Sequence, residues 1–202
     1  MADLRQQFGD IDIYLFDQLL RGRIRPGMRV LDAGCGGGRN LVLLLREGYE
    51  VFAADADPQA IDAARRLAAA LAPHLPAENF RCEPLQRMTF PEDFAEVVIS
   101  SAVLHFAADD GEFAAMLAGT WRAVARGGML FCRLASSIGI EDRVGPGRGR
   151  RRLPDGSERY LVDEDFLVTS TAQLGGDLMD PLKTTVVQNQ RAMTTWVLRK
   201  RP

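Results

Sequence analysis

The sequence has few cysteines, no long apolar run and no excess of charge of either sign. Its three cysteines, Cys35, Cys82 and Cys132, show no CxxC spacing, so neither a disulfide framework nor a metal site is expected. Burial as small apolar side chains is the preferred interpretation. No apolar run approaches the ~20 residues needed to cross a bilayer, and the first residues lack the basic and apolar regions of a secretion signal. We therefore expect a cytoplasmic protein without membrane association.

The length and charge of the chain narrow the possibilities further. Its 202 residues suffice for one α/β domain with a substantial core and are few for two. A net charge of −2 provides no basic field that would attract nucleic acid. We therefore predict a single domain over residues 1–202 that acts on a small molecule rather than on nucleic acid, as a monomer or homodimer.

A glycine-rich turn lies between a short apolar strand and a helix in residues 28–40, MRVLDAGCGGGRN. Asp32 stands at the tip of the strand, and Gly34, Gly36, Gly37 and Gly38 form the turn. Glycines permit positive φ and let a ligand lie against the main chain. The following helix offers unpaired N–H groups and a partial positive charge. This pattern predicts a cofactor-binding turn at the carboxyl end of a parallel strand.

The spacing of the turn indicates which cofactor it binds. A dinucleotide-binding G-x-G-x-x-G motif fails in both registers, because Arg39 or Leu41 occupies the place of the third glycine. No lysine follows the glycines, which excludes a P-loop. The Asp32 carboxylate would repel a pyrophosphate at short range. It would suit S-adenosylmethionine, which carries an ammonium group, a ribose diol and a sulfonium and has no phosphate.

The stretch VLDAGCGGGRN resembles the first motif of class I S-adenosylmethionine-dependent methyltransferases. Its GCGxGRN form is similar to small bacterial members of the tellurite-resistance type, related to methyltransferase types 11 and 12. The resemblance covers residues 26–135 well and the remainder loosely. It implies a doubly wound, Rossmann-like α/β fold with a seven-stranded, mainly parallel sheet and an antiparallel last strand. It also implies S-adenosyl-L-methionine as cofactor and S-adenosyl-L-homocysteine as product.

A second acid, Asp55, ends the strand EVFAA about twenty residues after the turn. A carboxylate in this place can accept two hydrogen bonds from a ribose diol. Its alternative role is to cap the helix at Pro58, but Asp57 is better placed as the cap and leaves Asp55 free. The resemblance puts Ala56 by the adenine. It also puts Glu83, Pro84 and Leu85 around the adenine, although glutamate replaces the more usual aspartate and Glu83 could be a simple polar strand end.

Together, the turn, the strand ends and the resemblance predict a set of cofactor-binding residues. They are Asp32, Gly34, Cys35, Gly36, Gly38, Arg39, Asn40, Asp55, Ala56, Glu83, Pro84, Leu85 and Ser100. The segment SSAVLHF, residues 100–106, is expected to line the cleft where methyl donor and acceptor meet. Its His105 is a candidate base or a packed structural residue, with no preference. Arg133 is a candidate substrate residue, since a charge within a central strand must be paired or reach the cleft. Tyr14 is a second candidate, because the polar end of its phenol can face a wet cleft.

The remaining elements follow from apolar periodicity and turn signals. Residues 1–25 are predicted to form an N-terminal lid helix. Helices are expected over residues 58–72, over 109–125, where Gly127 and Gly128 end the helix, and over 161–174. Residues 182–187 and 193–199 should form a closing antiparallel hairpin. Residues 137–160 are predicted to be a long mobile loop, whose arginines 143, 148, 150, 151 and 152 are either solvated or contact an anion or nucleic acid.

The function predicted is in-line transfer of a methyl group from S-adenosylmethionine to a small molecule. An activated sulfonium needs alignment and a dehydrated cleft more than a dedicated nucleophile. Two alternatives remain open: an NAD(P)-dependent oxidoreductase of the same fold, and an RNA-modifying methyltransferase that uses the arginine-rich loop.

Overall fold

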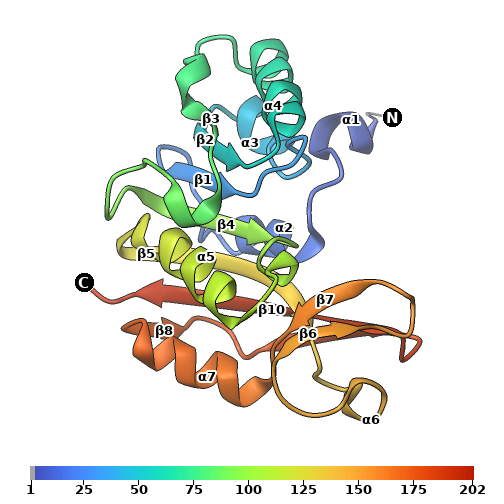
Figure 1. Cartoon of the computed structure of the whole chain (residues 1–202). Coiled ribbons are helices and arrows are strands. Elements are labelled where there is room, and N and C mark those ends of the chain that lie inside the picture. The colour runs from blue at the N-terminus through green and yellow to red at the C-terminus, as the bar shows by residue number, and fades with distance from the viewer. Residues whose placement is uncertain (1–2) are drawn as a thin grey trace.

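The structure is a computed structural model and describes residues 3–202. A central sheet has the strand order β3-β2-β1-β4-β5-β10-β8, with β9 paired alongside β10 (Figure 1). The strands of this sheet are β1 Arg29–Ala33, β2 Glu50–Asp55, β3 Phe80–Cys82, β4 Ala95–Ser101, β5 Val124–Ser136, β8 Gly176–Leu178, β9 Lys183–Val187 and β10 Arg191–Lys200. Strands β1 to β5 pair in parallel, whereas β10 runs antiparallel to β5, β8 and β9. The prediction of a mainly parallel sheet with an antiparallel end is confirmed.

The sheet contains one strand more than the seven predicted. The additional strand, β8, has three residues, Gly-Asp-Leu, and pairs with the end of β10. A strand this short shows no apolar alternation, so the sequence carried no signal for it. The closing hairpin of β9 and β10 matches the prediction and has the register Thr194↔Thr184.

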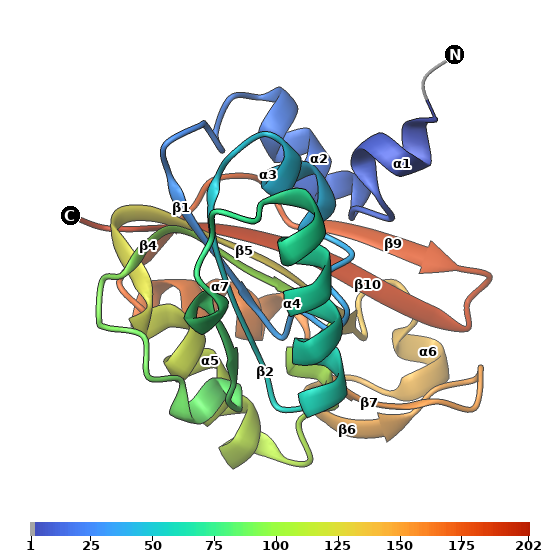
Figure 2. The same cartoon turned by 90° about the horizontal axis from the view of Figure 1, so that it is seen from above.

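Helices cover both faces of the sheet, as Figure 2 shows. The helices are α1 Leu4–Phe8, α2 Ile13–Leu20, α3 Val42–Arg46, α4 Pro58–Leu71, α5 Asp110–Arg122, α6 Glu141–Val144 and α7 Glu164–Gln173, with short 3-10 turns at Ala77–Asn79, Leu85–Arg87 and Leu104–Phe106. Helices α2, α3 and α4 pack on the face that carries Val30, and α5 and α7 pack on the face that carries Leu31. Successive strand residues point to opposite faces, so every strand of the sheet's centre is apolar on both sides. No helix among residues 3–202 is both long and apolar enough to cross a membrane.

Two predicted helices have different bounds in the structure. The N-terminal segment forms two helices, because the chain turns at Gly9, which has φ +66°, and Asp12 caps a new helix by accepting from the Tyr14 N–H. Helix α5 ends at Arg122 rather than at Gly127 and Gly128, which lie inside β5. A Cβ on Gly128 would lie 2.9 Å from the carbonyl oxygen of Glu96. The glycine therefore permits close strand approach and does not end the helix.

Residues 137–160 are not a continuous loop. They contain α6 and the strand β6, Gly149–Arg152, which pairs antiparallel with β7, Glu158–Leu161, to make a separate hairpin. Its apolar residues, including Leu153 and Leu161, are buried against Ala135 and Ala192 of the main sheet. The sequence did not predict this hairpin, because β6 consists of glycine and arginine and shows no apolar alternation. Its apolar contacts are made by residues at its ends. The hairpin lies beyond the carboxyl end of β5 (Figure 1).

Candidate functional site

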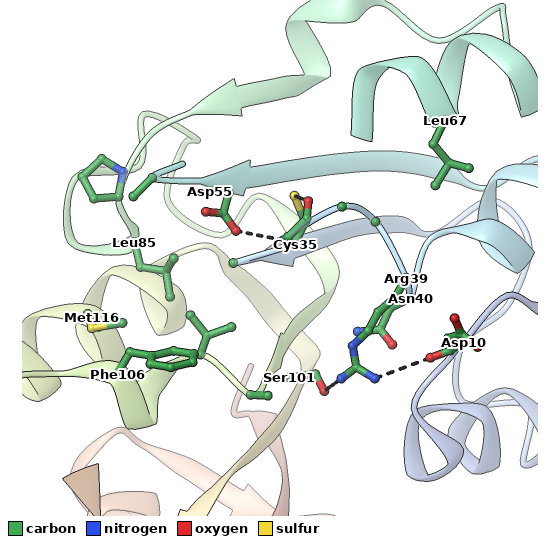
Figure 3. Close-up of a pocket in the computed structure, with 18 of the residues that line it drawn as sticks. Asp10, Cys35, Arg39, Asn40, Asp55, Leu67, Leu85, Ser101, Phe106 and Met116 are labelled. Carbon is green, nitrogen blue, oxygen red and sulfur yellow. Dashed lines mark hydrogen bonds between the residues drawn. The ribbon is translucent and has the colours of Figure 1, made fainter. Parts of the chain in front are cut away.

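A cavity of about 830 Å³ opens where the glycine turn meets the carboxyl ends of β2 and β4 (Figure 3). Its lining comprises residues 34–40 of the turn, Val42, Asp55, Ala56, Leu67, residues 84–86, residues 101–103, Phe106, Glu112 and Met116, and from the N-terminal segment Arg5, Gly9 and Asp10. All the predicted cofactor residues line this first cavity except Asp32, Glu83 and Ser100. The first cavity therefore lies at the edge of the sheet where the sequence analysis expected it.

The glycines of the turn serve two different purposes. Gly34 has φ +84°, and a Cβ on it would lie 2.5 Å from the methyl groups of Val103, so it lets the turn pack against the loop after β4. Gly36 has φ +52°, and a Cβ on it would meet nothing within 4 Å. Its missing side chain therefore leaves space on the cavity side, where a ligand can lie against the backbone.

Asp55 is held beside the turn by two backbone N–H groups. Its Oδ2 accepts from the N–H of Gly36 at 2.8 Å (Figure 3). Its Oδ1 accepts from the N–H of Asp57 at 3.0 Å. Each carboxylate oxygen retains a further lone pair, so the group can still accept two hydroxyl donors. Asp57 caps α4 by accepting from the Gln59 N–H, which confirms the predicted cap. Contact between Asp55 and a ribose diol stays a prediction.

Asp32 lies behind the turn and does not line the cavity. Its side chain is 1% exposed, and neither carboxylate oxygen has a hydrogen-bond partner. Burial raises the pKa of Asp32 to about 7, against the lowering effect of Arg39, and the Asp55 charge raises it further. Contact between Asp32 and a ligand thus stays a prediction. What the structure shows is a buried carboxyl, two residues before Gly34, whose oxygens have no hydrogen-bond partner within residues 3–202.

Glu83 and Ser100 lie elsewhere than predicted. Both oxygens of Glu83 are engaged by Thr89, at 2.7 Å from its N–H and 2.6 Å from its hydroxyl, so Glu83 holds a loop closed. Ser100 is fully buried within β4, and its neighbour Ser101 lines the first cavity instead. Side chains alternate along a strand, so the predicted serine was one residue away from the one that faces the ligand space.

A second cavity of about 450 Å³ adjoins the first, and Ala102 and Phe106 line both. Its other lining residues are His105, Arg133, Ala135, Leu153, Asp155, Ser157, Arg159, Thr185, Val187, Arg191, Ala192 and Met193. Ala102 has φ +65°, and its N–H donates to the carbonyl of Arg133 at 2.7 Å. A non-glycine residue in the left-handed region is strained, and such residues concentrate at functional sites.

His105 is buried, and its ring orientation is fixed by β5. Its Nδ1 accepts from the N–H of Ala135 at 3.1 Å, so the neutral ring carries its hydrogen on Nε2. Burial, assisted by the charge of Arg159, lowers the pKa of His105 to about 4. With one nitrogen accepting and the other protonated, the ring presents a hydrogen-bond donor and has no free lone pair. This geometry favours the structural alternative over the base.

Arg133 lines the second cavity, and Tyr14 lies next to it. The Arg133 guanidinium carbon lies 5.2 Å from the centre of the Tyr14 ring. The Tyr14 hydroxyl lies 2.7 Å from the hydroxyl of Thr185, which itself lines the cavity. Tyr14 does not line either cavity directly, so it supports the wall rather than forming it.

Asp12, in the N-terminal segment, contacts residues that line the two cavities. The sequence did not predict Asp12 as a site residue. Its buried Oδ2 accepts from Arg133 Nη1 at 3.0 Å and from the Ser101 hydroxyl at 3.2 Å. Arg39 in turn donates to the Ser101 hydroxyl at 2.9 Å, and Asn40 accepts from the Asp12 N–H at 3.0 Å. The capping position of Asp12 was readable from the sequence. Its pairing with Arg133, 121 residues further along, was not.

The arginines of the segment 137–160 mostly make contacts within the protein. Arg148 pairs with Asp110 at 3.2 Å, Arg150 pairs with Glu158 at 3.4 Å, and Arg151 donates to the carbonyl of Val144 at 2.7 Å. The β6–β7 hairpin corrects the expectation of a continuous loop, and three of the five clustered arginines have partners within the protein. Arg148 lines a separate cavity of about 290 Å³, whereas Arg159 and Arg191, which line the second cavity, lie outside the predicted cluster.

Titratable side chains do not assemble a metal site here. Among residues 3–202, no group of three or more histidine, cysteine, aspartate and glutamate side chains is arranged to hold a metal ion. The three cysteines are free, and two of them, Cys35 and Cys132, are buried.

Comparison with known proteins agrees with the fold and the cavity. Residues 30–128 match the family described as "Methyltransferase domain". The ubiquinone biosynthesis O-methyltransferase of Brucella anthropi is 29% identical over 165 residues, which cover 79% of this chain. The chain spans 64% of the length of that relative.

Two solved structures have the same fold along nearly the whole chain. The 1,6-didemethyltoxoflavin-N1-methyltransferase of Burkholderia thailandensis, solved with 1,6-didemethyltoxoflavin and S-adenosylhomocysteine, has a TM-score of 0.72 at 17% identity and covers 99% of this chain and 82% of its own. The magnesium protoporphyrin IX methyltransferase of Synechocystis PCC 6803, solved with S-adenosylmethionine, has a TM-score of 0.68 at 16% identity. The match covers 98% of this chain and 89% of that protein's chain. Residues 30–128 thus match a methyltransferase domain, and nearly the whole chain has the fold of solved methyltransferases that bind S-adenosylmethionine or S-adenosylhomocysteine.

Proposed function

We propose that the protein binds S-adenosylmethionine in the first cavity and transfers its methyl group to a small molecule in the second. The observation that carries this proposal is the pair of adjoining cavities, one floored by an open glycine cradle with Asp55 beside it. Phe106 and the strained Ala102 line both cavities, so a donor and an acceptor bound in them would meet at this wall.

The side chains around the first cavity suit each part of this cofactor. Asp55 accepts from the ribose diol, Ala56, Pro84 and Leu85 flank the adenine, and the backbone at Gly36 approaches the methionine end. The buried Asp32 carboxyl contributes negative potential below a ligand with two positive charges. The bound cofactor supplies an already activated methyl group. The protein's part is therefore to align the reactants and keep water out.

The second cavity has the size of a small-molecule site, since such sites measure roughly 300–1,000 Å³. Two proteins of the same fold are named for small organic molecules, 1,6-didemethyltoxoflavin and magnesium protoporphyrin IX. RNA modification has less support, because three of the five arginines on which it rested, Arg148, Arg150 and Arg151, make contacts within the protein.

Replacement of Asp55 by alanine is expected to weaken binding of S-adenosylhomocysteine at least about 100-fold. Two hydroxyl hydrogen bonds to a carboxylate contribute roughly 1.5–3 kcal/mol each, and 1.4 kcal/mol is a factor of ten. Titration calorimetry measures the loss directly. Asp57→Ala is the control, because it removes only a helix cap worth about 1 kcal/mol of stability and should bind normally. Saturable binding of NADH with no heat from S-adenosylhomocysteine would refute the proposal.

Gly36→Ala is expected to block the same cofactor while leaving the protein folded. The added methyl group meets no protein atom within 4 Å, so the folding cost is that of a left-handed alanine, about 1–2 kcal/mol. In the ligand space it fills the cradle, and binding should fall at least about tenfold. The matched control is Gly48→Ala, which has φ +73° and open surroundings away from the cavity. Equal affinities of the two variants would contradict a ligand lying on the turn.

A further inference from the structure

We infer that the acceptor is an organic anion, whose negative group is held in the second cavity by Arg133, Arg159 and Arg191. This inference rests on the proposed function, because it takes the second cavity to be the acceptor site. It goes further by assigning a charge class to the acceptor and by naming the side chains that select it.

The lining of the second cavity has a clear excess of positive charge. Three guanidinium groups face it, and Asp155 is its one acidic residue. That carboxylate is already engaged, because its Oδ1 accepts from the Ser157 N–H at 2.9 Å and from the Ser157 hydroxyl at 2.6 Å. These hydrogen bonds, with the charges of Arg191 and Arg159, hold the pKa of Asp155 below its usual range. An anion entering the cavity therefore meets net positive charge.

Each arginine retains donors for a ligand. Arg133 gives Nη1 to Asp12, whereas its Nη2 makes no hydrogen bond within residues 3–202 and remains as a donor for an anion. Arg159 gives Nη1 to the carbonyl of Glu158, which leaves the rest of its planar fork available for bidentate binding. Arg191 makes no ion pair within residues 3–202 and lies at the cavity.

The same cavity has apolar walls, which indicates an anion with an apolar body. Leu153, Val187 and Met193 line it, together with Phe106, which is shared with the first cavity. The guanidinium of Arg159 lies 4.9 Å from the centre of the Phe106 ring. Charged groups at one part of the lining and apolar side chains at another are what a carboxylate or similar anion on a hydrocarbon or aromatic frame requires.

The second cavity has hydrogen-bond donors but no side chain placed to accept a proton, which agrees with an acceptor that is already ionised when it binds. His105 offers Nε2–H as a donor and has no free lone pair, and Asp155 is held by Ser157. The other lining residues carry no carboxylate, imidazole or thiol. The cavity thus supplies hydrogen-bond donors and positive charge but no group placed to take up a proton.

Matched pairs of probes that differ only in charge test the inference. Protein saturated with S-adenosylhomocysteine is titrated with 4-hydroxybenzoate against 4-hydroxybenzamide, and with indole-3-acetate against indole-3-acetamide, while ligand-detected NMR and calorimetry report binding. At least one carboxylate should bind saturably and about tenfold or more tighter than its amide. The double variant Arg159→Gln/Arg191→Gln should abolish that preference and keep its affinity for S-adenosylhomocysteine. Arg133 is not replaced, because its removal would leave the buried Asp12 carboxylate without its ion-pair partner.

The control variant is Arg152→Gln, which removes an exposed arginine of β6 that lines neither cavity and should preserve the carboxylate preference. Amides that bind as tightly as carboxylates would overturn the inference, as would binding of neither class by protein that holds S-adenosylhomocysteine. Preference for carboxylates in the double variant equal to that of the wild type would also overturn it. Failure to bind S-adenosylhomocysteine at all would instead count against the proposed function.

Discussion

Replacement of Asp32 by asparagine is expected to stabilise the ligand-free protein by about 4 kcal/mol at pH 8 and by almost nothing at pH 4. The carboxyl is fully buried with no hydrogen-bond partner, and burial raises its pKa from an ordinary value near 3.8 to about 7. One pKa unit corresponds to about 1.36 kcal/mol, so ionising this group in the folded state costs about 4 kcal/mol once the pH exceeds 7.

The sign follows from counting protons. Between about pH 4 and pH 7 the folded protein keeps a proton on Asp32 that the unfolded chain has lost, so the free energy of unfolding falls as pH rises. His105 has the opposite effect. Its pKa is lowered from 6.5 to about 4, so between these values the unfolded chain binds the extra proton and stability rises with pH. The two slopes nearly cancel in the wild type from pH 4 to pH 6.5.

Asp32→Asn should therefore expose the contribution of His105. The variant's free energy of unfolding should rise by about 3 kcal/mol from pH 4 to pH 6.5, whereas that of the wild type changes little from these two groups. Urea denaturation at half-unit pH steps measures both curves. Asp57→Asn is the control, since asparagine caps a helix as well as aspartate does and no buried charge is removed. A gain from Asp32→Asn that is the same at pH 4 and pH 8 would show that its carboxyl is not perturbed.

Replacement of Asp12 by alanine is expected to destabilise the protein by about 3–5 kcal/mol, the usual cost of removing one partner of a buried ion pair. The change leaves Arg133 without its carboxylate and removes the acceptor of the Ser101 hydroxyl and of the Tyr14 N–H. Because Ser101 also accepts from Arg39, which lines the first cavity, ligand binding in both cavities should weaken together. Thermal denaturation and calorimetry report the two effects.

Asp163→Ala provides the comparison, because Asp163 caps α7 through the Phe166 N–H and should cost only about 1 kcal/mol. Arg133→Met added to Asp12→Ala should recover part of the stability, since removing both members of a buried pair costs less than removing one. Equal losses in Asp12→Ala and Asp163→Ala would mean that Asp12 acts only as a cap.

The features that the sequence predicted correctly depend on neighbouring residues. The glycine turn, the place of Asp55 at the first cavity and the cap at Asp57 lie within 24 residues of one another, and each has a local conformational reason. The hairpin of β9 and β10 is likewise local. The parallel order of β1 to β5 followed from alternating strands and helices, which is why the fold class and most of the first cavity could be predicted.

The features that were missed depend on tertiary contacts. The partner of Arg133 was expected to exist, but nothing in the sequence indicates that it is Asp12. Ser101 rather than Ser100 faces the cavity because of the register of β4 within the sheet. Glu83 is engaged by Thr89, whose position depends on a loop conformation. The hairpin of β6 and β7 is stabilised by burial against the main sheet, so its glycine- and arginine-rich sequence shows little apolar alternation.

The backbone at Ala102 makes the gap between donor and acceptor depend on one small side chain. Alanine adds only a methyl group there, whereas a branched Cβ would crowd a left-handed backbone further, and Ala102 lies at the wall common to both cavities. A glycine would widen the gap and relax the chain, whereas valine would narrow the gap and add strain. The width of the wall between the two cavities can therefore change through a single codon, while Asp55 and the glycine turn stay as they are.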